Sequence, residues 1–434
     1  MKFTSRRSKR VAITASLIGA AAMVLSGCSV TGGGGADGAA GGDTGDINVL
    51  LMKQAGYTED DAAQMVKDFN VVNPDIHVKT TFVSYEALHD KIVTAAPSGT
   101  YDVVLMDVIW PTEFASKGLV VDVSDRFPAK WNDDMLGGAL ITAKYQDKYY
   151  GVPWYPSTKL FYFNSDMLAK AGATSADLNT WDGVLKVAKK IKAEQGVQYP
   201  IAWSWAQAEA LICDYAQLLG AFGGEFTDDA GNLIINKAPG VEALTWMKET
   251  IDEGLTNPSS TTFLEDDVSK TMASGQAAFG LNWESTFRDL NDASISSVVG
   301  NVGVLPTPEG ASGDRPGVNG AMALAITSKS KHQDAAWKFI EFVSSQSEQE
   351  KFVTSTMPSW KTSYDDSSVT KANPEVFKAA AVAYASGILR PQVPNYSAVS
   401  QIIQVELQNA LLGTKTPQQA MDDAVSLGNK ALKG

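Results

Sequence analysis

The sequence predicts an α/β fold in which mostly parallel strands are flanked by helices. Two observations carry this prediction. Short apolar segments alternate along the chain with longer segments whose apolar residues recur every three or four positions. Such alternation is typical of parallel sheets with helices on both faces. After residue 45 the chain is also long enough for two domains.

The first elements follow from their apolar spacing, and the Asn73-Pro74 pair ends the first helix. In chain order they are a buried strand at 47–52, a helix at 59–70, an alternating strand at 75–83, a helix at 85–95 and an apolar strand at 101–106. Ligands of such sheets bind at the carboxyl ends of the strands. That rule points to residues 54–57, 84–85 and 107–110.

The middle and end of the chain repeat this style. The expected elements are helices at 181–192, 207–221 and 240–253, a further segment at 268–274, strands at 277–282, 302–305 and 321–327, and a helix at 334–344. The remainder is mainly helical, with an interruption at 390–394 that contains two prolines.

The N-terminus predicts a secretory signal peptide over residues 1–27. Five basic residues precede the uncharged run 11–25, and the tetrapeptide Leu25-Ser26-Gly27-Cys28 stands directly at the end of this run. This tetrapeptide is similar to the lipobox of bacterial lipoproteins, in which the cysteine is lipidated. The alternative is an uncleaved membrane anchor, although the run is shorter than the roughly 20 residues of a spanning helix. Residues 28–45 then form a lipidated Cys28 and a flexible glycine-rich tether.

Composition excludes several classes of function. The formal net charge is −13, and residues 1–27 contribute only basic groups, so the remaining chain is still more acidic. Binding to nucleic acid or to an anionic membrane by bulk charge is therefore not expected. Cys213 is the only cysteine after Cys28, which leaves no internal disulfide, and its helical spacing with apolar neighbours indicates a buried structural thiol.

No motif for covalent or metal chemistry is visible. The histidines, His77, His89 and His332, show no metal-ligand spacing, and no glycine-rich loop with lysine is present. We therefore expect no catalytic residue, no metal and no cofactor.

Four segments together resemble a known family. They are 101–110 followed by 114–119, 148–154 followed by 160–164, 275–280, and 334–342. Their order and spacing are similar to those of the extracellular solute-binding proteins of carbohydrate ABC importers, the family that contains maltose- and trehalose/maltose-binding proteins. The likeness spans roughly residues 46 to 434.

The resemblance implies a two-lobed, periplasmic-binding-protein-like fold with a three-strand hinge. The crossings fall near 152–156, 305–308 and 357–360, and each contains proline. The lobes would then be 46–152 with 306–356, and 153–305 with 357–434. Ligand would be held in the cleft between them, and the lobes would close around it.

A site for an uncharged sugar needs aromatic faces for stacking, and carboxylates and amides for its hydroxyl groups. The resemblance puts a stacking aromatic at Trp283, and one of Trp203 and Trp205 is expected to face the cleft. Asp107 is the leading carboxylate, with a helix cap or salt bridge as the alternative, and Arg390 has a structural salt bridge as its alternative. The full set of candidates is Tyr85, Asp107, Trp110, Trp154, Tyr155, Trp203, Trp205, Trp283, Glu284, Asn319, Gly320, Arg390 and Tyr396.

The main hypothesis is a monomeric, lipid-anchored binding protein on the extracellular face of a bacterial membrane. It would capture an oligosaccharide, such as an α-glucoside, and deliver it to ABC permease subunits served by a cytoplasmic ATPase. The many tryptophans favour a ligand of two or more sugar units. The alternatives are a secreted glycoside hydrolase, with Asp107 and Glu284 as its carboxylate pair, and a solute receptor serving a sensor.

Overall fold

A five-stranded sheet lies at the centre of the first lobe of the computed structural model, which describes residues 44–433. Its strand order is β2-β1-β3-β11-β6. β1 pairs in parallel with β2 and β3, whereas β11 is antiparallel to both β3 and β6. The bounds are β1 (Gly45–Met52), β2 (Ile76–Val83), β3 (Val103–Asp107), β6 (Val152–Tyr155) and β11 (Met322–Ile326).

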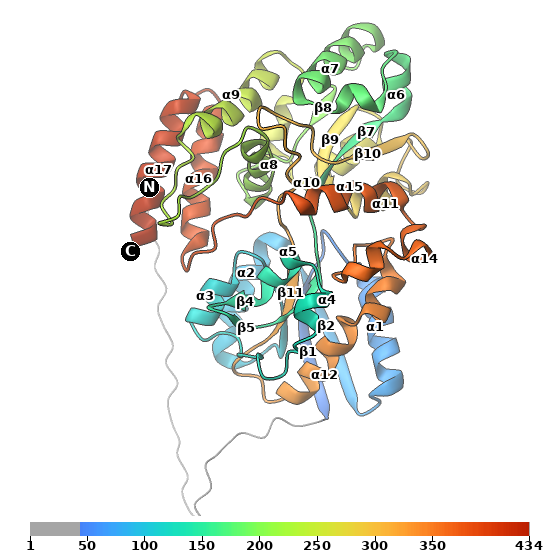
Figure 1. Ribbon diagram of the computed structural model, residues 1–434, viewed down its shortest axis with the longest axis vertical. Helices are drawn as coiled ribbons and strands as arrows, with labels where there is room; N and C mark the ends of the chain where they lie inside the picture. The colour runs from blue at the N-terminus through green and yellow to red at the C-terminus, as the bar shows by residue number, and fades with distance from the viewer. Residues whose placement is uncertain (1–43, 434) are drawn as a thin grey trace, which may run out of the picture. The chain divides into compact units, whose positions relative to one another are not determined.

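Helices and a small hairpin surround this sheet (Figure 1). They are α1 (Glu59–Val72), α2 (Tyr85–Ala95), α3 (Pro111–Ser116), α4 (Trp131–Asp134), α5 (Gly137–Leu140), α12 (Gln333–Val343) and α13 (Gln346–Gln349), with the hairpin strands β4 (Lys144–Tyr145) and β5 (Lys148–Tyr149). α1 begins at a capping box in which Thr58 and Asp61 exchange side chain-to-backbone hydrogen bonds.

The second lobe contains a four-stranded sheet of order β10-β7-β9-β8. β8 and β9 are parallel, while β7 is antiparallel to β9 and to β10. The bounds are β7 (Lys159–Asn164), β8 (Ile201–Ala202), β9 (Phe279–Trp283) and β10 (Val302–Leu305).

Helices of the second lobe lie around and beside this second sheet (Figure 1). They are α6 (Ser165–Lys170), α7 (Trp181–Gln195), α8 (Glu209–Ala221), α9 (Ala238–Asp252), α10 (Glu265–Ala273), α11 (Thr286–Leu290), α15 (Pro374–Ala385), α16 (Tyr396–Leu411) and α17 (Pro417–Lys433). α14 (Ser367–Thr370) lies in the segment that leads from the first lobe to α15.

The two-lobed α/β architecture is confirmed, and the sheets are mostly parallel in strand direction. Among residues 44–433, each of these two sheets has one reversed strand, β11 in the first and β7 in the second. Both reversed strands come directly after the chain has crossed from the other lobe. A strand that enters a sheet at the opposite end runs antiparallel to the strands that are connected by helices of the same lobe.

The observed pairings correct the expected lobe boundaries. β6 pairs with β11, so residues 153–155 belong to the first sheet, and the crossing falls at 156–158. Residues 306–318 also stay with the second lobe, because Gln217 donates hydrogen bonds to Thr307 and to the Pro316 carbonyl, and Val318 lies in the second core. The predicted signal peptide, the predicted lipidation at Cys28 and most of the predicted tether lie outside the described residues.

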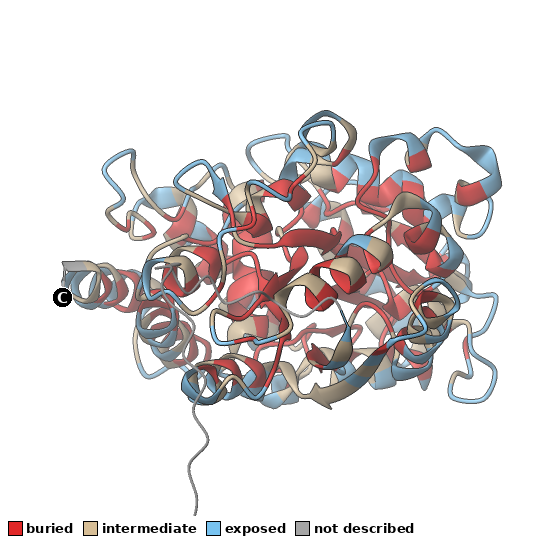
Figure 2. Ribbon diagram, turned by 90° about the horizontal axis from the view of Figure 1, so that it is seen from below, coloured by how far each residue is buried: buried red, intermediate tan, exposed pale blue. Residues whose placement is uncertain are grey.

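Figure 2 shows that burial is concentrated on the strands and on the inner faces of the helices. The first core holds Val104, Leu105 and Ile340, and the second holds Phe161, Leu211 and Phe279. Within residues 44–433 no helix has both the length and the apolar character needed to cross a membrane.

Candidate functional site

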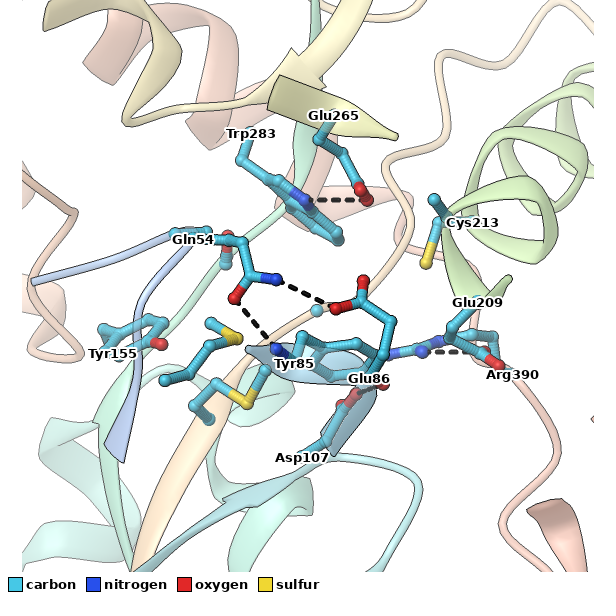
Figure 3. Close-up of a pocket in the computed structure, with 16 residues that line it drawn as sticks. Gln54, Tyr85, Glu86, Asp107, Tyr155, Glu209, Cys213, Glu265, Trp283 and Arg390 are labelled. Atoms are coloured by element: carbon cyan, nitrogen blue, oxygen red, sulfur yellow. Dashed lines mark hydrogen bonds and ion pairs between the residues drawn. The ribbon is translucent and has the colours of Figure 1, made fainter. Parts of the chain in front are cut away.

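A cavity lies between the lobes, at the carboxyl ends of β1, β3 and β9 (Figure 3). Its lining encloses about 560 Å³, including the part that opens to solvent. The first lobe contributes Met52, Gln54, Ala55, Tyr85, Glu86, Asp107, Tyr155 and Met322; the second lobe and the crossing segments contribute Ser157, Glu209, Ala210, Cys213, Glu265, Trp283, Gly320 and Arg390.

Arg390 connects the two lobes at one wall of this cavity. Its Nη2 donates to Asp107 Oδ1 at 3.0 Å, and its Nη1 donates to Glu209 Oε1 at 2.9 Å. Nη2 also donates to the carbonyl oxygen of Asn319 at 3.2 Å. Burial alone would lower the pKa of Arg390, but the adjacent carboxylates of Asp107 and Glu209 raise this pKa well above its ordinary value. The guanidinium therefore stays charged and bridges one carboxylate from each lobe.

Both of these carboxylates have further partners. The hydroxyl of Tyr85 donates to Asp107 Oδ2 at 2.6 Å, and Asp107 itself is only 1 % exposed. Glu209, the first residue of α8, accepts hydrogen bonds from the hydroxyls of Tyr396 and Ser400. Asp107 and Glu209 are thus saturated by protein groups, and their main effect is to hold Arg390 and the surrounding loops in place.

Gln54 orders the neighbouring part of the first lobe. Its Oε1 accepts from the backbone N–H of Tyr85 at 2.8 Å, and its Nε2 donates to Glu86 Oε2 at 3.0 Å. Gln54 thereby joins the end of β1 to the start of α2, where it directs the Glu86 carboxylate along the cavity wall (Figure 3).

Trp283, at the end of β9, forms the aromatic wall on the second lobe. Its Nε1 donates to Glu265 Oε1 at 3.3 Å. A Cβ atom at Gly320 would lie 2.4 Å from the Trp283 ring, so glycine is required for the backbone to pass this close. The ring is only partly buried and lines the cavity, an arrangement suited to stacking on a flat apolar ligand face.

A buried lysine supports this wall from behind. Lys159 is fully buried, and its Nζ lies 2.7 Å from Asp214 Oδ1, 3.3 Å from Glu265 Oε1 and 5.3 Å from the centre of the Trp283 ring. Burial would lower the pKa of Lys159, but Asp214 and Glu265 outweigh it and raise this pKa. The charged ammonium therefore fixes the position of Glu265.

Two more side chains complete the lining. Tyr155 is 2 % exposed and lines the cavity, and no hydrogen bond joins its hydroxyl to another of the described residues. Cys213 on α8 is buried, as expected, and burial raises the pKa of its thiol to about 12. A thiol that stays protonated is a poor nucleophile.

The structure brings together six of the residues predicted from the sequence. Tyr85, Asp107, Tyr155, Trp283, Gly320 and Arg390 all line the cavity. The rest lie elsewhere. Trp110 and Tyr396 line an adjoining, more open groove, which shares Tyr85, Glu86 and Glu209 with the cavity.

The expectation that one of Trp203 and Trp205 faces the cleft is wrong. Both are 0 % exposed in the core of the second lobe, where their rings stack at 5.1 Å with an angle of 9°. Trp203 Nε1 donates to Thr256 Oγ1 at 3.1 Å. Trp154 is likewise a core residue, 3 % exposed and packed 4.7 Å from the ring of Tyr57.

Glu284 and Asn319 serve the crossing segments instead of the cavity. Glu284 is buried and accepts hydrogen bonds from the Ser157 hydroxyl, the Thr158 N–H and the Tyr384 hydroxyl. Burial raises the pKa of Glu284 to about 7, although these hydrogen bonds oppose the rise. The side chain of Asn319 donates to the Gly138 carbonyl at 2.8 Å, and only its backbone carbonyl meets Arg390.

Sequence reasoning missed Glu86, Glu209 and Glu265, three of the four carboxylates at the cavity. Each lies in the first turn of a helix, where an acidic side chain is favoured by the helix dipole in any protein. Gln54 was within the segment expected at the end of the first strand, and the strand-end rule alone could have named it.

Residues 55–350 match the family described as bacterial extracellular solute-binding protein. Among solved structures, maltose-bound T. maritima MalE3 superposes with a TM-score of 0.80 at 29% identity, covering 88% of this chain and 98% of that chain. A probable ABC transporter-binding protein of Deinococcus radiodurans is 26% identical over 344 residues, which cover 75% of this chain and 79% of the relative. The arabinooligosaccharide-binding protein of Bacillus subtilis is 25% identical over 348 residues, covering 77% and 76%.

Proposed function

Because the chain belongs to the bacterial extracellular solute-binding protein family, we propose that it captures a sugar between its lobes and delivers it to the permease of an ABC importer. The matched relatives are named as binding proteins, and the superposed T. maritima protein holds maltose.

The cavity between the lobes is the observation that carries this proposal. It presents one face of the Trp283 ring beside carboxylate oxygens of Glu86 and Glu265 and the hydroxyl of Tyr155. Apolar C–H faces of a pyranose stack on such a ring, while its hydroxyls hydrogen-bond to the surrounding oxygens. Groups from both lobes would contact the same ligand, which couples binding to closure of the cleft.

The adjoining groove supports a ligand longer than one sugar unit. It shares the lining residues Tyr85, Glu86 and Glu209 with the cavity, and it adds polar groups such as Gln207 and Gln404. The tryptophan count, by contrast, no longer supports this inference, because Trp154, Trp203 and Trp205 pack in the lobe cores.

We further propose that lipid on Cys28 and the glycine-rich segment after it hold the binding lobes at the outer face of the cell membrane as a monomer. A tether of this kind raises the local concentration of the protein at its permease without fixing its orientation.

A hydrolase acting through Asp107 and Glu284 is disfavoured by their positions. Asp107 is bound to Arg390 and Tyr85, and Glu284 faces Ser157, Thr158 and Tyr384 at the crossing. Of these two carboxylates only Asp107 lines the cavity, so they do not flank a common substrate space.

A thermal-shift screen tests the proposed function. The panel contains maltose, trehalose, raffinose and fructo-, xylo-, manno- and arabino-oligosaccharides, with amino acids and dipeptides as the comparison. At least one sugar should raise the melting temperature progressively with its concentration. A protein that responds only to the amino acids or peptides would refute the assignment.

A further inference from the structure

Two pairs of carboxylates line the cavity, and each pair takes one member from each lobe. One cation bridges the first pair, whereas in the second pair only Glu265 has a cation, Lys159, which lies behind the cavity wall. Asp107 of the first lobe and Glu209 of the second share the guanidinium of Arg390. Glu86 on α2 of the first lobe and Glu265 on α10 of the second form the other pair, and no cation of the described residues bridges them. Figure 3 shows Glu86 and Glu265 on opposite sides of the space in front of Trp283.

The free hydrogen-bonding positions around this second pair are mostly acceptors. Within residues 44–433 the Glu86 carboxylate accepts one hydrogen bond, from Gln54 Nε2 to Oε2. Glu265 receives Trp283 Nε1 and Lys159 Nζ on the same oxygen, Oε1. One oxygen of each carboxylate is therefore left for a ligand.

A hydroxyl group of the first lobe also faces the cavity. Tyr155 is 2 % exposed and lines the cavity, and no hydrogen bond joins its hydroxyl to another of residues 44–433. Figure 3 shows this hydroxyl at the cavity end of the ring. The cationic lining is limited to Arg390, whose two terminal nitrogens are already occupied.

We propose that the ligand bridges Glu86 and Glu265 with hydrogen-bond donors, as Arg390 bridges Asp107 and Glu209, and that the site consequently selects by charge. Neutral sugars bind through hydroxyl groups, an amino sugar whose ammonium group lies between the two carboxylates binds more tightly, and phosphorylated or carboxylated sugars are rejected. The inference rests on the proposed sugar-binding function and assigns the charge class of its ligand.

The physical reason is the balance of charge at the cavity, where Glu86 is exposed and Glu265 is partly buried. An ammonium group supplies three donors and a positive charge to two carboxylates, and hydrogen bonds between charged partners are about twice as strong as neutral ones. A phosphate would place like charges together in the same cleft, a contact that interfaces use to suppress wrong ligands.

Calorimetric titration of matched sugars tests the proposal. Glucose and maltose, together with the neutral sugar that gives the largest thermal shift, are compared with their 2-amino-2-deoxy and 6-phosphate derivatives. Of the amino derivatives, the one that binds most tightly should have at least tenfold higher affinity than its neutral parent. Each phosphate derivative should bind at least tenfold more weakly than its parent. A phosphate derivative that binds as tightly as its parent would overturn the charge selection while leaving sugar binding intact. If no sugar of any charge binds, the proposed function itself fails, and the inference falls with it.

Variants assign the effect to the two carboxylates. Glu86→Gln and Glu265→Gln keep shape and remove charge, and each should reduce the preference for the amino derivative at least threefold. The matched control, Glu341→Gln, removes an exposed carboxylate on α12 outside the cavity and should leave the preference unchanged. An unchanged preference in both cavity variants would contradict the proposal, and the wild-type comparison of charged and neutral sugars decides it even where a variant does not fold.

Discussion

Removal of the Arg390 guanidinium should destabilise the ligand-free protein strongly. In Arg390→Met the side chain keeps much of its apolar volume but loses its hydrogen bonds to Asp107, Glu209 and the Asn319 carbonyl. Asp107, 1 % exposed, would retain only the Tyr85 hydroxyl, while Glu209 would keep Tyr396 and Ser400. Most of the cost therefore falls on Asp107.

The magnitude follows from the two lost ionic contacts. A hydrogen bond to a charged group contributes about 1.5–3 kcal/mol, so two of them predict a loss of about 3–6 kcal/mol. Breaking a buried ion pair on one side costs about 3–5 kcal/mol. We therefore expect the free energy of unfolding to fall by about 3–5 kcal/mol in Arg390→Met. Arg390→Lys keeps the charge but cannot reach both carboxylates in the same way, so it should lose about half as much.

Urea unfolding at pH 7.5, followed by tryptophan fluorescence, measures these differences. The double variant Arg390→Met/Asp107→Asn removes the stranded charge as well, and it should recover at least about 1 kcal/mol relative to the single variant. A loss below about 1 kcal/mol in Arg390→Met, or no recovery in the double variant, would refute the assignment of Arg390 as the link between the lobes.

Three further predictions concern the cavity wall and the crossing. Trp283→Ala should weaken sugar binding by at least ~1 kcal/mol in calorimetry. The control variant Trp131→Ala, outside the cavity, should keep the affinity of the wild type. If Trp283→Ala binds sugar as tightly as the wild type, Trp283 is not part of the site. Gly320→Ala should displace the Trp283 ring, lowering stability by about 1–3 kcal/mol and weakening binding, because the new Cβ would lie 2.4 Å from that ring; wild-type stability and affinity would contradict this close contact. Burial raises the pKa of Glu284 from 4.5 to about 7, so its contribution to stability is complete below about pH 4.5 and is lost as the pH rises through 7. Urea titrations of Glu284→Gln should lack about 3 kcal/mol of this pH-dependent loss in the free energy of unfolding. An unchanged pH profile would show that Glu284 does not cause the loss.

The spacing of apolar residues within each segment was sufficient to predict most helices and strands. The helix expected at 85–95 and the strand expected at 302–305 coincide with α2 and β10. The periodicity of apolar residues reports which side of an element is buried, and that information is contained within each segment. Lobe boundaries were less accurate: β6 and residues 306–318 follow their pairing partners, which lie far away in the sequence.

The aromatic candidates show where pattern fails. Trp203 and Trp205 have the size and chemistry of sugar-stacking residues, yet they stack on each other in the second core. A large aromatic side chain suits a core and a binding site equally well, so residue type cannot distinguish the two. Trp283 differs from these two tryptophans only because its strand ends at this point, where the backbone of Gly320 passes beside the Trp283 ring.

The sequence by itself determined the order of strands and helices, the acidic balance, and the features near the N-terminus that predict export and lipidation. Only the tertiary structure decided which carboxylates share the cavity and which of them are already paired. Asp107 and Arg390 are 283 positions apart, and Glu86 and Glu265 come from helices of different lobes. Apolar periodicity acts between near neighbours, whereas a binding site depends on where the folded chain brings distant side chains together.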